Sequence, residues 1–172
     1  LAANMTSTIA LFPSQITSSI AGRKLAGGVD AGAHHVSLKQ LIIISLIGGV
    51  LGALLLLATP PSFFAKLVPY LVLFATTVFA WGSFRRKPLH ATAGMSTTTL
   101  AAIQFAIAIY GGYFGGGIGF LMLAALTVAS QQVRTAGATK NVLAMTMNAS
   151  AVAVFAFSPQ VDWAAVLALA IG

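Results

Sequence analysis

The chain has 172 residues, of which 58% are hydrophobic and 6% are charged, and its mean hydropathy is +0.95. Globular domains carry about 25% charged residues, so this chain has too few polar side chains to coat a water-soluble core. Because the sequence contains no cysteine, disulfides and thiolate metal sites are excluded. The composition predicts an all-α integral membrane protein, a multi-span bundle surrounded by lipid.

The basic residues determine how we interpret the net charge of +7. They stand between apolar runs, and only Lys66 lies inside one. Cytoplasmic loops retain Lys and Arg, whereas nucleic-acid-binding proteins gather them on one face. We therefore expect the charges to orient the chain in a membrane, and we expect no nucleic-acid partner. The residues between the runs are Arg23, Lys24, Lys39, Arg85, Arg86, Lys87, Arg134 and Lys140.

The first half of the chain holds three uncharged or nearly uncharged apolar runs. A spanning helix needs about 20 such residues. We interpret 1–21 as the remainder of a span with Pro13 in its middle, and 41–58 and 62–84 as spans. Pro60 and Pro61 end the second run and suit the start of the third.

Residues 98–130 form the next apolar segment. As one helix its roughly 33 residues would be about 50 Å long, well beyond a hydrocarbon core of about 30 Å. Its centre, Tyr110 to Gly119, is dense in glycine, and each glycine weakens a helix by about 1 kcal/mol relative to alanine. A break near Gly111 to Gly117 is predicted. A single crossing and a re-entrant path both remain open.

Residues 141–157 form a further span, and 163–172 are part of another. Because the chain starts without Met and ends inside an apolar run, we expect a single transmembrane domain, 1–172, truncated at both ends. The loops 22–40 and 85–97 carry Lys and Arg, whereas the turn at 59–62 carries none. Both basic loops are therefore predicted to face the cytoplasm.

An internal repeat is also predicted. Asn4 and Asn141 each open an apolar stretch, and the glycine-containing run 41–52 resembles the start made by 164–172. This order suggests two repeats with a boundary near 88–97, an arrangement common in secondary transporters.

The glycine-rich centre and its polar neighbours are the candidate site. The glycines suit close helix packing, or a discontinuous helix whose free N–H groups and positive dipole end face an anion. Asn141 and Asn148, two helical turns apart, share a face. Interhelical hydrogen bonds would explain these amides, and interface anchoring would explain the bases. The candidate substrate-binding residues are Asn141, Lys140, Asn148, Arg134, Gly115, Gly116, Gly117, Asn4 and Thr8.

Enzymatic activity is not expected. The only acids, Asp30 and Asp162, stand at segment ends, and no G-x-S-x-G or H-E-x-x-H motif occurs. His34 and His35 have no further ligands at zinc spacing. We expect no cofactor and no metal.

Several short segments together resemble the TauE/SafE family of sulfite and organosulfonate exporters. They are Asn4 to Pro13, Thr59-Pro60-Pro61 with Leu67 to Leu71, Tyr110 to Leu123, Lys140-Asn141, and Val161-Asp162-Trp163. The resemblance implies a multi-pass protein of the plasma membrane, built from two repeats. The expected function is secondary transport, as an exporter, of a small anion such as sulfite or an organosulfonate. A passive anion channel and a non-transporting membrane subunit or scaffold are the alternatives.

Overall fold

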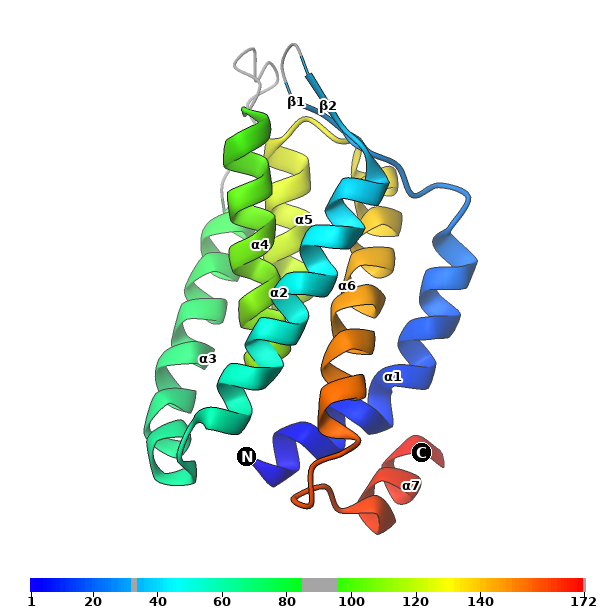
Figure 1. Cartoon of the computed structure of the whole chain (residues 1–172). Coiled ribbons are helices and arrows are strands. Elements are labelled where there is room, and N and C mark those ends of the chain that lie inside the picture. Colours follow the sequence, from blue (N-terminus) through cyan, green and yellow to red (C-terminus); the bar gives the residue numbers. More distant parts are fainter. Residues whose placement is uncertain (32–33, 85–95, 172) are drawn as a thin grey trace.

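A bundle of helices with a short hairpin at one end makes up the protein (Figure 1). This computed structural model describes residues 1–31, 34–84 and 96–171. The elements are α1 (Ala2–Gly22), β1 (Val29–Ala31), β2 (His34–Val36), α2 (Leu38–Ala58), α3 (Pro61–Phe84), α4 (Thr97–Tyr113), α5 (Ile118–Val128), α6 (Val133–Phe155) and α7 (Trp163–Ile171). The helical prediction is confirmed. The antiparallel pair β1–β2, with Val29 opposite Val36, lies in a segment expected to be only a loop.

Helices α2 and α3 are both long and apolar enough to cross a membrane. Helix α2 begins three residues before the predicted run because Ser37 and Gln40 form a capping box. The Ser37 hydroxyl accepts the Gln40 N–H, and the Gln40 side chain accepts the Ser37 N–H, which satisfies two otherwise free donors. Pro61 starts α3, where its missing N–H removes no helical hydrogen bond.

The 98–130 segment is broken, as predicted. Helix α4 ends at Tyr113 and α5 begins at Ile118. Gly115 and Gly117 have φ of +76° and +78°, a region that residues with a β-carbon rarely adopt. The chain reverses there, so α4 runs away from the hairpin end of the bundle and α5 returns toward it (Figure 1). The segment therefore returns to the end of the bundle at which it began.

This reversal places the start of α6 at the hairpin end, beside the starts of α2 and α4 (Figure 1). Helix α6 begins at Val133, before the predicted span 141–157, so Arg134 and Lys140 lie within the helix and not between helices. The predicted span began after Lys140 because it was defined by the absence of charge. The helix itself starts earlier, since Ala136, Ala138 and Thr139 are buried against the rest of the bundle. Arg85, Arg86, Lys87 and most of the predicted repeat boundary lie outside the described residues.

The ends of the bundle differ in charge. Arg23, Lys24 and Lys39 lie at the hairpin end with Arg134, whereas Lys66, near the start of α3, lies at the opposite end. Helices α1 and α6 run in opposite directions (Figure 1), as two inverted halves would require. The internal repeat itself stays a prediction.

We expect the hairpin end to face the cytoplasm, because basic residues concentrate there. Thr98→Cys and Gln132→Cys place single exposed thiols at that end, and Ser62→Cys places one at the other. A membrane-impermeant thiol reagent added outside intact cells should label only Ser62→Cys. Labelling of Thr98→Cys or Gln132→Cys before permeabilisation would show instead that the hairpin end faces outward.

Glycines of α2 set the contact between α2, α4 and α6. A β-carbon on Gly52 would collide with the Ile109 carbonyl oxygen of α4, and one on Gly49 with the Ser150 hydroxyl of α6. Gly112 of α4 in turn lies against the Gly49 carbonyl. These backbones approach too closely for any side chain to fit between them. The close packing of α2 with α4 and α6 therefore fixes the position of α4, the first helix of the broken segment.

Gly52→Ala should destabilise the protein by about 1–3 kcal/mol, because the added methyl group meets backbone atoms that move only with the whole helix. Gly137→Ala in α6 is the matched control, since a β-carbon there meets no atom of the described structure within 4 Å. Thermal unfolding of the purified variants in detergent measures both. Equal melting temperatures would contradict the close packing.

Candidate functional site

The break between α4 and α5 leaves two helix ends with different partners. At the end of α4, the Phe114 N–H donates to the Tyr110 carbonyl at 2.9 Å, and Asn4 Nδ2 of α1 donates to the Tyr113 carbonyl at 3.3 Å. The last carbonyls of a helix have no partner within it, so these donors cap the negative end of α4. Asn4 therefore lies beside the break and acts on its carbonyl side.

The start of α5 has no comparable cap. Gly117 occupies the N-cap position, and it has no side chain to accept a hydrogen bond from the first-turn N–H groups. The Phe120 N–H donates to the Gly117 carbonyl at 3.1 Å, and the N–H groups before it have no hydrogen-bond partner among the described residues. The N-terminus of a helix carries a partial positive charge together with such free donors. A donor-rich end of this kind favours an anion.

The start of α5 packs against α3. A β-carbon on Gly117 would lie 2.8 Å from Ala75 Cβ of α3. Ala75 is about 21 Å along α3, a helix about 36 Å long. Ala75 belongs to a candidate membrane span, so the N-terminus of α5 packs against the second half of that span.

Lys140 is the cation nearest to this helix end among the described contacts. A β-carbon on Gly119, in the first turn of α5, would lie 3.7 Å from Lys140 Nζ and 3.7 Å from its Cδ. Gly119 therefore leaves room for the lysine side chain, and the half-buried amine lies against the first turn of α5. It is about 10 Å along α6 from the start of that helix. Neither acid of the chain, Asp30 or Asp162, lies in α4, α5 or α6.

Asn148, the second asparagine of α6, faces α1. Asn148 is 4% exposed, and its Nδ2 donates to Gln15 Oε1 of α1 at 2.6 Å. Ala138, on the same side of α6, packs against Gly22 at the end of α1. Asn141 lies between them by helical periodicity and is half-buried, about 100° around the helix from Lys140. Interhelical hydrogen bonding therefore explains Asn148. The Asn141 side chain makes no hydrogen bond among the described residues, so the same explanation does not apply to it.

The remaining candidates lie apart from one another. Thr8 donates to the Asn4 carbonyl within α1 at 2.8 Å, one turn from the residue that caps α4. Arg134 is exposed at the start of α6, about 9 Å along the helix from Lys140. The structure thus brings Gly115, Gly116, Gly117, Asn4 and Lys140 to the break, and it leaves Arg134 at the hairpin end.

Tyr110 was not among the predicted site residues. Its hydroxyl lies 2.8 Å from the Gly116 carbonyl oxygen and 3.3 Å from the Leu71 carbonyl oxygen of α3. Its ring makes edge contacts with Phe74 and Phe114. The only sequence signal was its place at the start of the glycine cluster.

An apolar cavity of about 280 Å³ lies beside the break, between α3 and the start of α5. Its wall is mainly aromatic and aliphatic, and Gly116 and Gly117 form part of it. The other lining residues are Val72, Ala75, Thr76, Phe79, Phe114 and Phe120.

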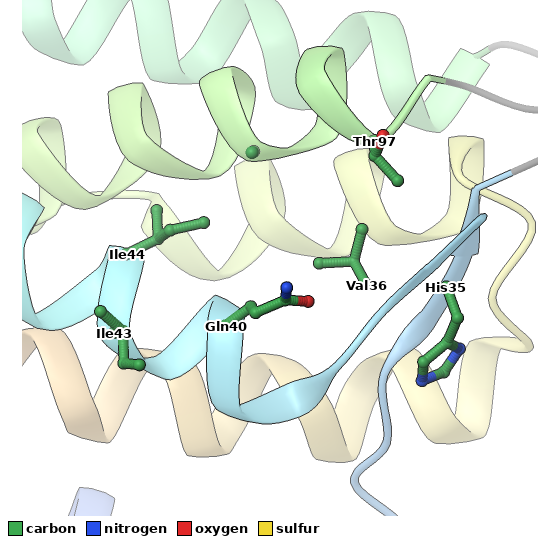
Figure 2. Close-up of a pocket in the computed structure, with 7 residues that line it drawn as sticks. His35, Val36, Gln40, Ile43, Ile44 and Thr97 are labelled. Carbon is green, nitrogen blue, oxygen red and sulfur yellow. The ribbon is translucent and has the colours of Figure 1, made fainter.

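A larger cavity of about 520 Å³ lies at the hairpin end, where β2 and the starts of α2 and α4 meet (Figure 2). Its wall includes Ile43, Ile44 and Gln40, and no Lys or Arg is among the described residues that line it. The Gln40 Oε1 already accepts the Ser37 N–H at 2.9 Å. The smaller cavity is thus the one that adjoins the break, at Gly116 and Gly117.

Comparison with known proteins identifies a family for the chain. A search of curated proteins and a search of solved structures gave no match. The model of the sulfite exporter TauE/SafE family matches residues 1–172, which is the whole chain. This is a family of membrane transporters, and the apolar helices fit such a protein. The chain therefore belongs to the sulfite exporter TauE/SafE family.

Proposed function

We propose that the protein is a secondary carrier that exports a small oxyanion, sulfite or an organosulfonate, across the plasma membrane. The observation that carries this proposal is the position of Lys140, a cation against the first turn of a helix whose N-terminus has no side-chain cap. An anion removed from water needs donors and positive charge, and α5 and Lys140 offer both.

Each residue near the break has a distinct role in this proposal. The N–H groups at the start of α5 bind the anion, and Lys140 supplies the counter-charge. Asn4 donates to the Tyr113 carbonyl at the end of α4, and this bond offsets part of the negative charge at that helix end. Thr8 donates to the backbone carbonyl of Asn4. Arg134, exposed at the hairpin end, attracts anions from the water. Asn148 holds α6 against α1 through Gln15, which keeps Asn141 and Lys140 in place.

The break favours a carrier over a channel. Discontinuous helices that meet substrate near the bilayer midplane are typical of carriers that work by alternating access. No carboxylate occurs in α4, α5 or α6, so we propose no proton coupling through these helices.

Flux in proteoliposomes tests the proposal. Purified protein should take up radiolabelled sulfite with saturation, and unlabelled sulfite trapped inside should accelerate that uptake. Currents without counterflow would identify a channel. A folded protein with no flux for sulfite or for simple sulfonates would indicate a subunit or scaffold.

Asn141→Ala should weaken anion binding about tenfold, because a hydrogen bond to a charged group contributes about 1.5–3 kcal/mol. Lost packing alone would lower stability by about 0.6 kcal/mol and leave affinity unchanged. Asn148→Ala is the control, since it leaves Gln15 without its partner and should lower the melting temperature more than the affinity. Wild-type affinity in Asn141→Ala would remove Asn141 from the site.

A further inference from the structure

The hydroxyl of Tyr110 lies between two backbone carbonyls. It has one hydrogen to donate, and the Gly116 oxygen at 2.8 Å is closer than the Leu71 oxygen at 3.3 Å. The shorter bond has the usual length for a hydroxyl donor, and the longer one is beyond it. The hydroxyl thus holds the Gly116 carbonyl and reaches α3 with a weaker second contact.

The fixed carbonyl also fixes the next N–H group. The peptide that joins Gly116 to Gly117 is trans and planar, so its C=O and N–H point in opposite directions. When Tyr110 holds the Gly116 oxygen, the Gly117 N–H must point away from Tyr110. Glycine neighbours allow this peptide to rotate more freely than any other pair of residues would, so an external bond is needed to set it.

We infer that Tyr110 is a positioning residue of the anion site, which rests on the function proposed above. It aims the Gly117 N–H, the first free donor at the start of α5, toward the position that the anion occupies. Tyr110 does not touch the anion in this arrangement. Because its ring and hydroxyl also contact Phe74 and Leu71, the donor is oriented relative to α3, the helix that lines the apolar cavity.

Tyr110→Phe removes the hydroxyl and keeps the ring contacts with Phe74 and Phe114. Tyr113→Phe is the matched control, because that hydroxyl bonds the Thr59 hydroxyl at the α2–α3 turn at 3.3 Å, away from Gly116. In intact protein with ¹⁵N-labelled glycine, Tyr110→Phe should shift the Gly117 amide resonance, and Tyr113→Phe should not. Sulfite binding should weaken about fivefold in Tyr110→Phe, which equals about 1 kcal/mol.

The two measurements separate two kinds of failure. An unchanged Gly117 resonance in Tyr110→Phe overturns the positioning role. A shifted resonance with unchanged sulfite affinity supports that role and places the anion away from the break, against the proposed function. If Tyr110→Phe does not fold, the wild type provides the test. Deuteration of the Tyr110 hydroxyl should shift the Gly116 carbonyl carbon, and an absent isotope shift overturns the inference.

Discussion

Lys140→Gln should weaken anion binding about ten- to hundredfold, the largest effect that we expect on affinity. A hydrogen bond to a charged partner contributes about 1.5–3 kcal/mol, and this contribution is lost when the amine becomes a neutral amide. The Lys140 amine lies against the first turn of α5, where low polarity strengthens its attraction for an anion. Divalent anions should lose more affinity than monovalent anions, because the charge interaction scales with their charge.

Two variants act as controls for Lys140→Gln. Lys66→Gln removes an exposed lysine at the other end of the bundle and should leave affinity unchanged. Lys140→Arg keeps the charge and should retain more affinity than Lys140→Gln. Titration calorimetry of purified protein with sulfite measures all three. If Lys140→Gln folds and binds sulfite like the wild type, the Lys140 amine contributes only to membrane orientation and to helix packing.

Gly117→Ala should destabilise the protein by about 2–5 kcal/mol, the largest effect that we expect on stability. A non-glycine residue at φ +78° costs about 1–2 kcal/mol. The new β-carbon would also lie 2.8 Å from Ala75 Cβ, an overpacking that costs about 1–3 kcal/mol more. Transport should fall with stability, since the collision pushes α3 away from the start of α5.

Gly115→Ala separates strain from collision. Gly115 has φ +76°, but a β-carbon there meets its nearest atom, the Gly111 carbonyl oxygen, at an ordinary 3.5 Å. Its effect should therefore be only about 1–2 kcal/mol. Denaturation of the two variants in detergent gives the comparison. Equal losses would mean that α3 does not pack on Gly117 as described.

The continuous apolar runs were the most predictable part of this fold. Residues 41–58 and 62–84 are long, nearly uncharged and separated by two prolines, and they match α2 and α3. The start of α2 was missed because the capping box of Ser37 and Gln40 lies outside the apolar run. The start of α6 was missed for a related reason, since Arg134 and Lys140 interrupt a hydropathy pattern without interrupting a helix.

The break in 98–130 was predictable from the sequence, but the reversal of the chain that follows it was not. Length and glycine content predict that 98–130 cannot be one helix. The reversal depends on the φ values of Gly115 and Gly117, which composition does not specify. Polar residues near the break were identified from the sequence, but two of their hydrogen bonds were not. Asn148 and Gln15 lie in helices far apart in the sequence, and only the tertiary fold pairs them. The bond from Tyr110 to Gly116 spans six residues and depends on the backbone path of the break.

Direct observation of the bound anion tests the central claim, that substrate lies between the start of α5 and Lys140. Selenite replaces the sulfur of sulfite with selenium, so an anomalous difference map of crystals grown with selenite locates the anion. We expect one strong peak within hydrogen-bond reach of the Gly117 N–H and of Lys140 Nζ. A peak only in the larger cavity beside Gln40 and Thr97, with none at the break, would contradict it.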